Sequence, residues 1–247
     1  MLSKNEIKYI QSSAHKKTRD DERIFLAEGS KIIKEVLNEC PEQLIKLYAL
    51  PLFYNEQRLK PDGKQYIEIT ETELERISQL QTPHQAVALL RQFKSPSVTD
   101  VKEEWVLALY AIRDPGNMGT IIRLADWFGI RHIICSSDCV DIYNPKVVQA
   151  SMGSVLRIKV IEGELQQLLP QCPKPVLATT LGGTPIQQFT FQNQGTILIG
   201  NEARGVADEL LQLVDSEISI PSFGHAESLN AAVATGIVLW ETKRQVK

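Results

Sequence analysis

Residues 105–123 read WVLALYAIRDPGNMGTIIR, and this stretch predicts the fold of the second half of the chain. It opens on a continuous apolar run, residues 105–112, which is typical of a strand covered on both faces of a parallel sheet. Residues 114–116, Asp-Pro-Gly, are a turn signal. Over residues 117–128 the apolar side chains recur at helical spacing. A buried strand, a turn and a helix in succession indicate an α/β fold.

Strands and helices alternate along the rest of the chain, on both sides of a polar segment. That segment, residues 92–103, contains a proline and lacks apolar periodicity, so it reads as a linker. Before it we expect strands at residues 23–28, 44–50, 66–70 and 86–90, and helices at residues 31–38, with Ser30 as N-cap, and 71–78. After it we expect strands at residues 105–112, 132–135, 155–160, 175–180 and 196–199, and a last helix at residues 228–244. The sequence therefore predicts a small α/β domain, residues 1–96, and a parallel-sheet domain, residues 103–247.

The composition is that of a globular protein: of 247 residues, 43% are hydrophobic and 23% are charged. No apolar run is long enough to cross a bilayer, and the first residues lack the apolar core of a signal peptide, so we expect a cytoplasmic protein. A net charge of −3 argues against a protein that coats nucleic acid by charge alone. The N-terminal cations form either a local RNA-binding patch or a solvated helix face; they are Lys4, Lys8, Lys16, Lys17 and Arg19.

The spacing of cysteine and histidine argues against a metal site. Of the four cysteines only Cys135 and Cys139 lie near each other, they do not form a CxxC pair, and the histidines do not cluster with them. A zinc site needs about four clustered ligands. We therefore expect no metal and no disulfide, but free and mostly buried thiols in a reducing compartment.

Three glycine-containing loops lie at the ends of expected strands, where ligands bind in parallel sheets. The first, residues 113–120, leads into a helix whose free N–H groups suit an anion. The second, residues 199–205, ends a strand with two glycines, an acid and an arginine. The third, residues 218–232, carries Ser228 and Asn230 at the head of the last helix, where Ser228 is most simply an N-cap. Taken singly, each loop is better explained as a structural turn than as a site.

Together and in this order, the three loops resemble the SpoU (TrmH) family of RNA 2′-O-ribose methyltransferases, within the SPOUT superfamily. The first motif of that family, D-P-x-N-x-G-x-x-x-R, is matched by Asp114, Pro115, Asn117, Gly119 and Arg123. The second, G-x-E-x-x-G, is matched by Gly200, Glu202 and Gly205. The third, I-P-(loop)-S-L-N, is matched by Ile220, Pro221, Ser228, Leu229 and Asn230. The resemblance covers the chain from the linker onward.

The region before the linker is similar to the small substrate-binding domain, related to ribosomal protein L30e, that often precedes this catalytic domain. Glu28-Gly29 and residues 82–85, Thr-Pro-His-Gln, fit the common pattern. Ala86 departs from it, because a glycine is frequent at that position. The resemblance thus implies an RNA-binding first domain whose RNA surface is unassigned.

The resemblance implies a function and a set of site residues. It implies methylation of a ribose 2′-hydroxyl in structured RNA, ribosomal RNA in preference to transfer RNA, with S-adenosylmethionine as cofactor. It also implies a deep trefoil knot at the C-terminal end of the catalytic domain and a homodimer formed through that domain. The implied catalytic residues are Arg123, Asn117, Glu202, Ser228 and Asn230, and the implied cofactor-binding residues are Thr180, Gly200, Ile220 and Leu229.

The role of Arg123 is the point at which family and physical chemistry diverge. In the family the corresponding arginine is proposed as the base, yet a guanidinium keeps its proton to a pKa above about 12. We therefore prefer Arg123 as a phosphate clamp that orients the hydroxyl. Glu202 either holds Arg123 in place or accepts the proton itself, and the sequence leaves both open.

Two functions of other classes compete with this interpretation. A non-catalytic RNA- or ribosome-binding protein could use the same fold, but it would not need Asn117, Arg123 and Glu202 together. A nucleotide-dependent oxidoreductase would want a G-x-G-x-x-G turn early in the chain, and residues 116–119 do not supply one.

Overall fold

The computed structural model describes residues 1–101 and 104–246, and these form two compact units. The first unit comprises Met1–Lys94 and Asp141–Leu156, and the second comprises Ser95–Val140 and Arg157–Lys247. The start expected for the second domain, residue 103, lies outside the described residues. Among the described residues, every helix is too short or too polar to span a membrane.

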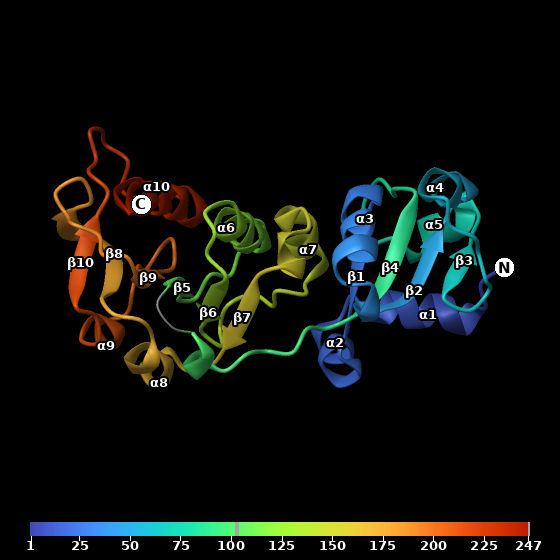
Figure 1. Ribbon diagram of the computed structural model, residues 1–247, viewed down its shortest axis with the longest axis horizontal. Helices are drawn as coiled ribbons and strands as arrows, with labels where there is room; N and C mark the ends of the chain where they lie inside the picture. The colour runs from blue at the N-terminus through green and yellow to red at the C-terminus, as the bar shows by residue number, and fades with distance from the viewer. Residues whose placement is uncertain (102–103, 247) are drawn as a thin grey trace. The chain divides into compact units, whose positions relative to one another are not determined.

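The first unit is built on a mixed sheet of four strands within residues 1–101, in the order β1-β4-β2-β3 (Figure 1). β4 runs antiparallel to β1 and β2, whereas β2 and β3 are parallel. The strands are β1 (Ile24–Glu28), β2 (Leu44–Ala49), β3 (Tyr66–Glu68) and β4 (Ala86–Arg91). The helices are α1 (Lys4–Ser12), α2 (Lys16–Glu22), α3 (Ser30–Glu39), α4 (Pro51–Gln57) and α5 (Glu71–Ile77).

Residues 141–156, which include α7 (Pro145–Ser151), fold with this first unit although they come from the middle of the chain. The Arg19 side chain is only 2% exposed, and its guanidinium contacts the Asp141 carboxylate at 2.5 Å. The Tyr143 ring lies 4.6 Å from that of Phe25, centroid to centroid. Arg19 is therefore an internal structural cation and not part of a surface patch for RNA.

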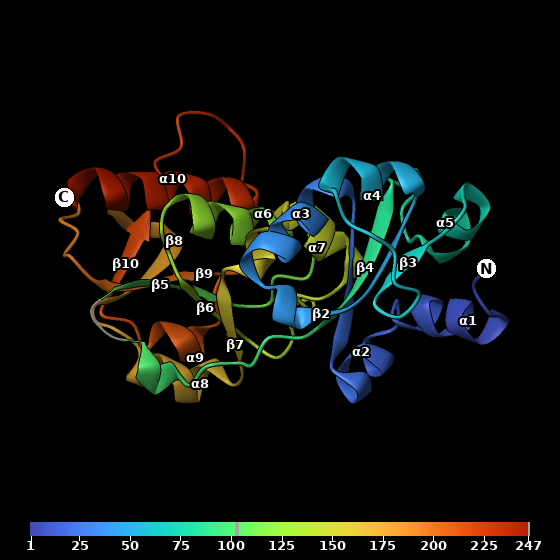
Figure 2. The ribbon, with the colours of Figure 1, turned by 45° about the vertical axis from the view of Figure 1, so that its right-hand side comes forward.

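The second unit is built on a wholly parallel sheet within residues 104–246, in the order β10-β8-β9-β5-β6-β7. Its strands are β5 (Trp105–Leu109), β6 (His132–Cys135), β7 (Lys159–Glu162), β8 (Val176–Pro185), β9 (Gly195–Ile199) and β10 (Ser216–Ser219). Helices α6 (Pro115–Trp127) and α10 (Ala231–Gln245) lie side by side over one face of this sheet (Figures 1 and 2). Helices α8 (Leu165–Leu168) and α9 (Asp208–Leu211) cover the other face. The expected α/β class, with a small domain before a parallel-sheet domain, is confirmed.

The strand order makes the carboxyl ends of β5 and β9 the place where a ligand is expected. From β5 the chain moves outward through β6 and β7, then returns to build β8, β9 and β10 on the other side. β5 and β9 are therefore neighbours whose following segments leave in opposite directions. In open parallel sheets such a switch point, at the carboxyl ends of the strands, is the usual binding crevice.

Several expected boundaries were wrong, each for a local reason. The strand expected at residues 105–112 ends at Leu109, because Ala111 adopts the left-handed conformation, φ 53°. Residues 155–160 begin in a 3-10 turn, and β7 starts only at Lys159. α3 is capped by Gly29 and not by Ser30, which lies inside the helix.

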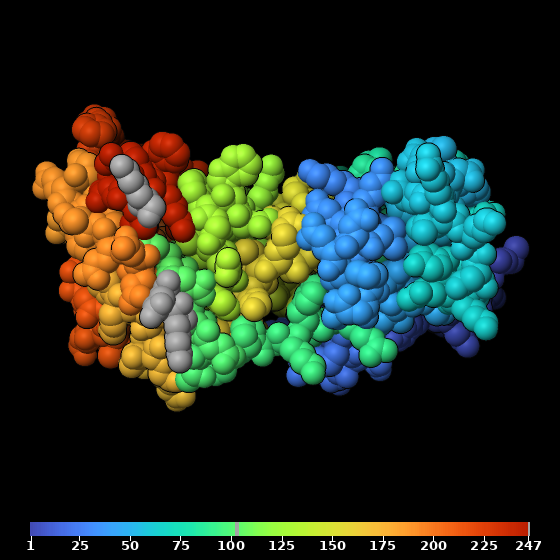
Figure 3. Space-filling model, viewed as in Figure 1, coloured from blue at the N-terminus to red at the C-terminus, as the bar shows by residue number. Residues whose placement is uncertain are grey.

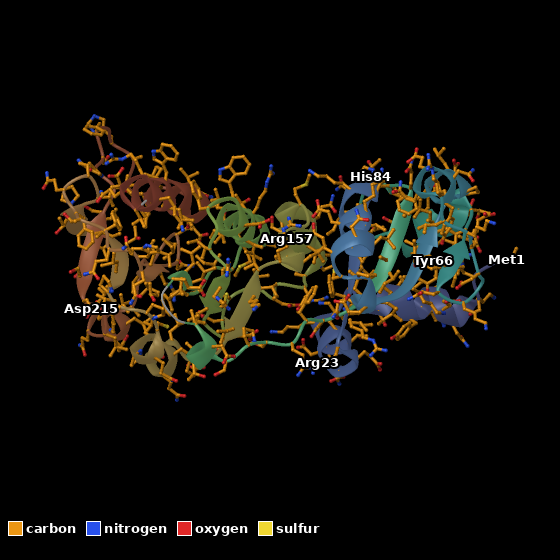
Figure 4. All side chains as sticks on the ribbon, viewed as in Figure 1. Met1, Arg23, Tyr66, His84, Arg157 and Asp215 are labelled. Carbon is orange, nitrogen blue, oxygen red and sulfur yellow. The ribbon has the colours of Figure 1, made fainter. Side chains whose placement is uncertain are left out.

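The last strand was not expected, because its sequence, Ser-Glu-Ile-Ser, is polar. Asp215, just before β10, accepts a hydrogen bond from the backbone N–H of Val176 at 2.7 Å (Figure 4). That contact and a backbone hydrogen bond of 2.8 Å from the Asp215 N–H to the Val176 carbonyl join the starts of β8 and β10, and Ile218 of β10 is fully buried. Edge strands tolerate polar side chains because one side of the strand is solvated.

Candidate active site

The segment after β5 is held by side chains from the two neighbouring strand ends. The N–H of Ala111 donates to Ser136 Oγ, beyond β6, at 2.9 Å. The carbonyl of Ala111 accepts from Asn201 Nδ2, beyond β9, at 2.9 Å. The N–H of Ile112 donates to Cys139 Sγ at 3.3 Å. Backbone groups that the sheet can no longer satisfy thus find partners on both sides.

Helix α6 starts directly after this segment, and its start positions Asn117. Asp114 is the N-cap, and its Oδ1 accepts from the N–H of Asn117 at 2.7 Å. Pro115 occupies the first helical position, where a missing N–H costs nothing and the fixed φ suits the helix. The Asp-Pro-Gly signal is therefore a helix start that fixes the third residue of α6.

The loop after β9 is a tight turn that presents Glu202. Asn201 and Gly205 exchange two backbone hydrogen bonds, of 3.0 and 2.9 Å. Asn201 Oδ1 also accepts from the N–H groups of Ala203 and Arg204 at 3.0 and 3.1 Å. A Cβ at Gly200 would lie 2.4 Å from the carbonyl carbon of Gly205, so this turn has no room for a side chain there.

The three loops meet through a chain of side-chain hydrogen bonds. Asn117 Nδ2 donates to Glu202 Oε1 at 2.6 Å, and Asn230 Nδ2 donates to Asn117 Oδ1 at 2.8 Å. Asn230 is the N-cap of α10, and its Oδ1 accepts from the N–H groups of Ala232 and Val233. The expectation that Ser228 caps this helix was therefore wrong, because the helix starts at Ala231.

Two of the expected catalytic residues do not join this chain. Arg123 lies on α6 with an exposed side chain, and Ser228 is exposed in the loop before α10. Over residues 1–101 and 104–246, neither side chain makes a hydrogen bond or an ion pair within the protein. At about 3.6 residues per turn, Arg123 faces a different side of α6 from Asn117.

The expected cofactor-binding residues lie within β8, directly after β9 and β10, and in the loop before α10. Gly200 directly follows β9, Ile220 directly follows β10, and Leu229 is exposed beside Asn230. Thr180 lies in the stretch between Ala178, which pairs with Glu217, and Thr184, which pairs with Ile218. Its Oγ1 donates to Glu217 Oε2 at 2.8 Å.

The neighbouring Thr179 is the residue in this stretch that the sequence did not indicate. Its Oγ1 is buried and, within the described part of the chain, has no hydrogen-bond partner. Buried hydroxyls are nearly always paired, so an unpaired one within β8 points to a ligand or water. Threonine is common in strands, and nothing in the sequence separates this one from others.

Cys135, at the end of β6, and Cys139, in the loop after it, share a hydrogen bond near the same site. The hydrogen bond with Cys135 lowers the pKa of Cys139 to about 7. The same contact, together with burial, raises the pKa of Cys135. Cys139 is thus the thiol of the two whose pKa is lowered, and its Sγ accepts from the N–H of Ile112, in the backbone that leads to Asn117.

Comparison with known proteins finds relatives for both parts of the chain. The model of the SpoU rRNA Methylase family matches residues 104–240, and that of the MRM3-like substrate binding domain matches residues 4–88. A relative in Bacillus subtilis (strain 168), the 23S rRNA (guanosine(2553)-2′-O)-methyltransferase RlmP, is 30% identical over 238 residues. The match covers 92% of each chain.

Solved structures resemble the chain over nearly its full length. A putative RNA methyltransferase of the TrmH family from Porphyromonas gingivalis has a TM-score of 0.89 and 31% identity, and the match covers 99% of both chains. An AdoMet-bound rRNA methyltransferase from Sinorhizobium meliloti has a TM-score of 0.88 and 30% identity. That match covers 100% of this chain and 98% of the other.

Proposed function

Because this chain belongs to the SpoU rRNA methylase family, we propose that it methylates a ribose 2′-hydroxyl of ribosomal RNA, in the cytoplasm, with S-adenosylmethionine as methyl donor. One observation of the structure carries this function. The hydrogen-bonded chain Asn230–Asn117–Glu202 unites all three motif loops at the switch point of the parallel sheet. A structural turn would not need the polar side chains of three separate loops to converge.

The residues within β8 and in the segments after β9 and β10 fit S-adenosylmethionine. Thr179 Oγ1 is a buried polar atom without a partner in the described chain, ready for a polar group of the cofactor. Leu181, on β8, and Phe223, on the loop after β10, are exposed apolar side chains suited to cover an adenosine or a methionine chain. Gly200, Ile220, Leu229 and Thr180 complete the proposed contacts. When bound, S-adenosylmethionine supplies a methyl group attached to a positively charged sulfur.

The chain's own residues supply position and a proton acceptor. Asn117 donates to one carboxylate oxygen of Glu202 and is itself held by Asn230, so the second oxygen of Glu202 has no partner among the described residues. Of the two roles considered for Glu202, holding Arg123 and accepting the proton, the second is favoured, because Arg123 does not contact Glu202 among the described residues. The second carboxylate oxygen is then the atom that accepts the proton of the ribose hydroxyl. Arg123, exposed on α6, is left to clamp an RNA phosphate and orient the hydroxyl. Ser228 is placed on the loop that would line the substrate side.

We assign residues 103–247 as the catalytic domain, because they contain all three motif loops. Residues 1–96 are assigned as an L30e-like substrate-binding domain. A cavity of about 520 Å³ in the first unit supports the second part. Glu28, Gly29, His84 and Gln85, which fit the L30e-like pattern, all line that cavity (His84 is labelled in Figure 4). We also assign to the loops after β9 and β10 the trefoil knot typical of the family.

A homodimer completes the proposal. Val233, Ile237 and Trp240 of α10 are 51%, 37% and 62% exposed. Their spacing of four and three residues puts them on one face of the helix. The side chains of α10 (red) reach the surface beside those of α6 (yellow-green) (Figure 3), and Trp127 on α6 is also exposed. An apolar stripe next to the site is the surface expected of a subunit interface.

The test is methyl transfer to RNA from cells that lack the protein. Purified protein, total RNA and S-adenosylmethionine with a labelled methyl group are incubated, and the RNA is digested to nucleosides. We expect label in a 2′-O-methyl nucleoside of ribosomal RNA. Label in transfer RNA would change the substrate, and label on a base would overturn the chemistry. If the protein binds RNA but neither transfers label nor binds S-adenosylmethionine, the non-catalytic RNA-binding function is favoured.

A further inference from the structure

The end of β5 holds a backbone conformation that its own residue does not favour. Ala111 has φ 53°, a left-handed conformation in which the Cβ of an L-residue crowds the following carbonyl. Such conformations persist where surrounding contacts over-determine them, and they cluster at functional sites. Ala111 lies six residues before Asn117, so its conformation sets the direction in which the chain approaches α6.

Two side chains hold Ala111: Ser136 Oγ accepts from its N–H, and Asn201, in the loop after β9, donates to its carbonyl. Of these two, Asn201 also shapes the turn that carries Glu202. Asn201 Nδ2 donates to the carbonyl of Ala111 at 2.9 Å. Asn201 Oδ1 accepts from the N–H groups of Ala203 and Arg204. The amide oxygen of Asn201 thus accepts two hydrogen bonds within the turn that carries Glu202. The amide nitrogen donates to the loop after β5.

Asn201 joins the loop after β5 to the loop after β9, and these two loops must meet for Asn117 to bond to Glu202. Asn117 comes from the β5 loop and Glu202 from the β9 loop, and their contact is 2.6 Å long. A small rotation of either loop would break this contact, because a hydrogen bond weakens steeply with misalignment. The side chain of Asn201 hydrogen-bonds to neither Asn117 nor Glu202, because its amide is used by the Ala111 carbonyl and by two N–H groups of its own turn.

We propose that Asn201 is a positioning residue for methyl transfer, which fixes Glu202 against Asn117 by holding Ala111 in its left-handed conformation. This inference rests on the proposed function of the same site. It assigns Asn201 no contact with the ribose, the base or the cofactor. Its effect is therefore on the rate of the chemical step and not on the binding of either substrate.

The first test is Asn201→Asp, which keeps the oxygen that accepts from Ala203 and Arg204 but replaces the donor to Ala111 by an acceptor. We expect kcat for methyl transfer to fall about tenfold or more, since misplacement by about 1 Å costs up to about a hundredfold. KM for S-adenosylmethionine and the melting temperature stay near those of the wild type. The matched control is Asn193→Asp, the same charge change at an exposed position, which leaves kcat unchanged.

The second test is the double variant Ala111→Gly with Asn201→Asp. Glycine adopts a positive φ as readily as a negative one, so it relieves the strain that Asn201 holds in place. We expect the double variant to recover part of the lost kcat, because glycine removes the cost of the positive φ but not the repulsion between the new carboxylate and the carbonyl of residue 111. Ala111→Gly alone should stay close to the wild type. A wild-type kcat in Asn201→Asp, or no recovery in the double variant, would overturn the proposal.

A readout independent of activity separates this inference from the proposed function. In ¹⁵N-labelled protein, the side-chain amide resonances of Asn117 and Asn230 should shift in Asn201→Asp and return in the double variant. If the wild-type protein transfers no methyl group but the resonances behave so, the proposed function fails and with it the role in methyl transfer, while Asn201 still holds Glu202 against Asn117. If the resonances do not move, the positioning role fails, whatever the activity.

Discussion

At Asn230, hydrogen-bond polarity fixes the direction of the whole hydrogen-bonded chain Asn230–Asn117–Glu202. Its Oδ1 is used by two N–H groups of α10, so only the amide nitrogen can face Asn117. Asn117 must then present its oxygen to Asn230 and its amide nitrogen to Glu202. The chain therefore ends on a carboxylate, which is acceptor-only when ionised. Each amide orientation follows from the one before it.

The first residue-level prediction concerns Glu202. Glu202→Gln keeps an oxygen for Asn117 but replaces the free carboxylate oxygen by an amide that cannot accept a proton. We expect kcat to fall by about 10²–10⁴, the usual contribution of a general base, with cofactor affinity unchanged. Single-turnover transfer and calorimetry measure the two quantities, with the exposed Glu209→Gln on α9 as control. A kcat within about twofold of the wild type would leave Glu202 with a purely structural role.

Cys139 leads to a prediction about pH. Since the hydrogen bond with Cys135 lowers the Cys139 pKa to about 7, its reactive thiolate forms as pH rises through 7. An unperturbed thiol does so only near pH 8.5. Alkylation by iodoacetamide, followed by mass spectrometry over roughly pH 5 to 9, should thus show a half-maximal rate near pH 7 at Cys139. Cys135, whose pKa is raised, should stay unmodified, and a half-maximal rate above about pH 8 at Cys139 would contradict the coupling.

At the scale of elements, the sequence identified strands with long apolar runs and missed those set by contacts far along the chain. β5, β6 and β9 are buried throughout, so their hydrophobicity alone predicted them. β10 has one apolar residue, Ile218, and is held to β8 by backbone pairing and by the contact of Asp215 with Val176, which lies 39 positions earlier. Likewise, the three loops could be predicted to share one sheet edge, whereas Asn201 could not be singled out. The proposed role of Asn201 depends on the positive φ of Ala111, and no local sequence pattern reveals that conformation.

Helix α10 carries a glycine whose replacement should stabilise the protein. A Cβ on Gly236 would lie 3.5 Å from the Leu124 side chain of α6, an ordinary contact. A glycine inside a helix costs about 1 kcal/mol relative to alanine. Gly236→Ala should therefore raise the melting temperature by about 2–4 °C, measured by calorimetry. Gly200→Ala is the opposite case, because its Cβ would meet backbone at 2.4 Å, and it should lower the melting temperature. Equal shifts for both variants would refute this interpretation of the two glycines.

At the scale of the whole molecule, each unit has its own sheet and its own core. In the second unit a core cluster runs from Val98 and Val101, in the expected linker, to Leu210 on α9. The linker is therefore partly a structural segment, which its polar composition did not indicate. In the first unit, residues 141–156 supply Tyr143 and Asp141 to a sheet formed by the N-terminal residues. A truncated chain that ended at the linker would deprive the first unit of both side chains.

The exposed stripe on α10 yields the prediction for the assembly. Val233, Ile237 and Trp240 are placed so that a second copy could cover them, and a stable interface buries about 1,200–2,000 Å² in total. We expect the wild-type protein to sediment as a dimer at micromolar concentration and Val233→Glu/Trp240→Glu to sediment as a folded monomer. Folding should survive, because both side chains are already exposed in the single chain. Leu52→Glu on α4, also an exposed apolar side chain at 55%, is the matched control and should remain dimeric. A wild-type protein that sediments as a monomer would remove this stripe as the interface, whereas dissociation with loss of methyl transfer would mean that the site is completed across it.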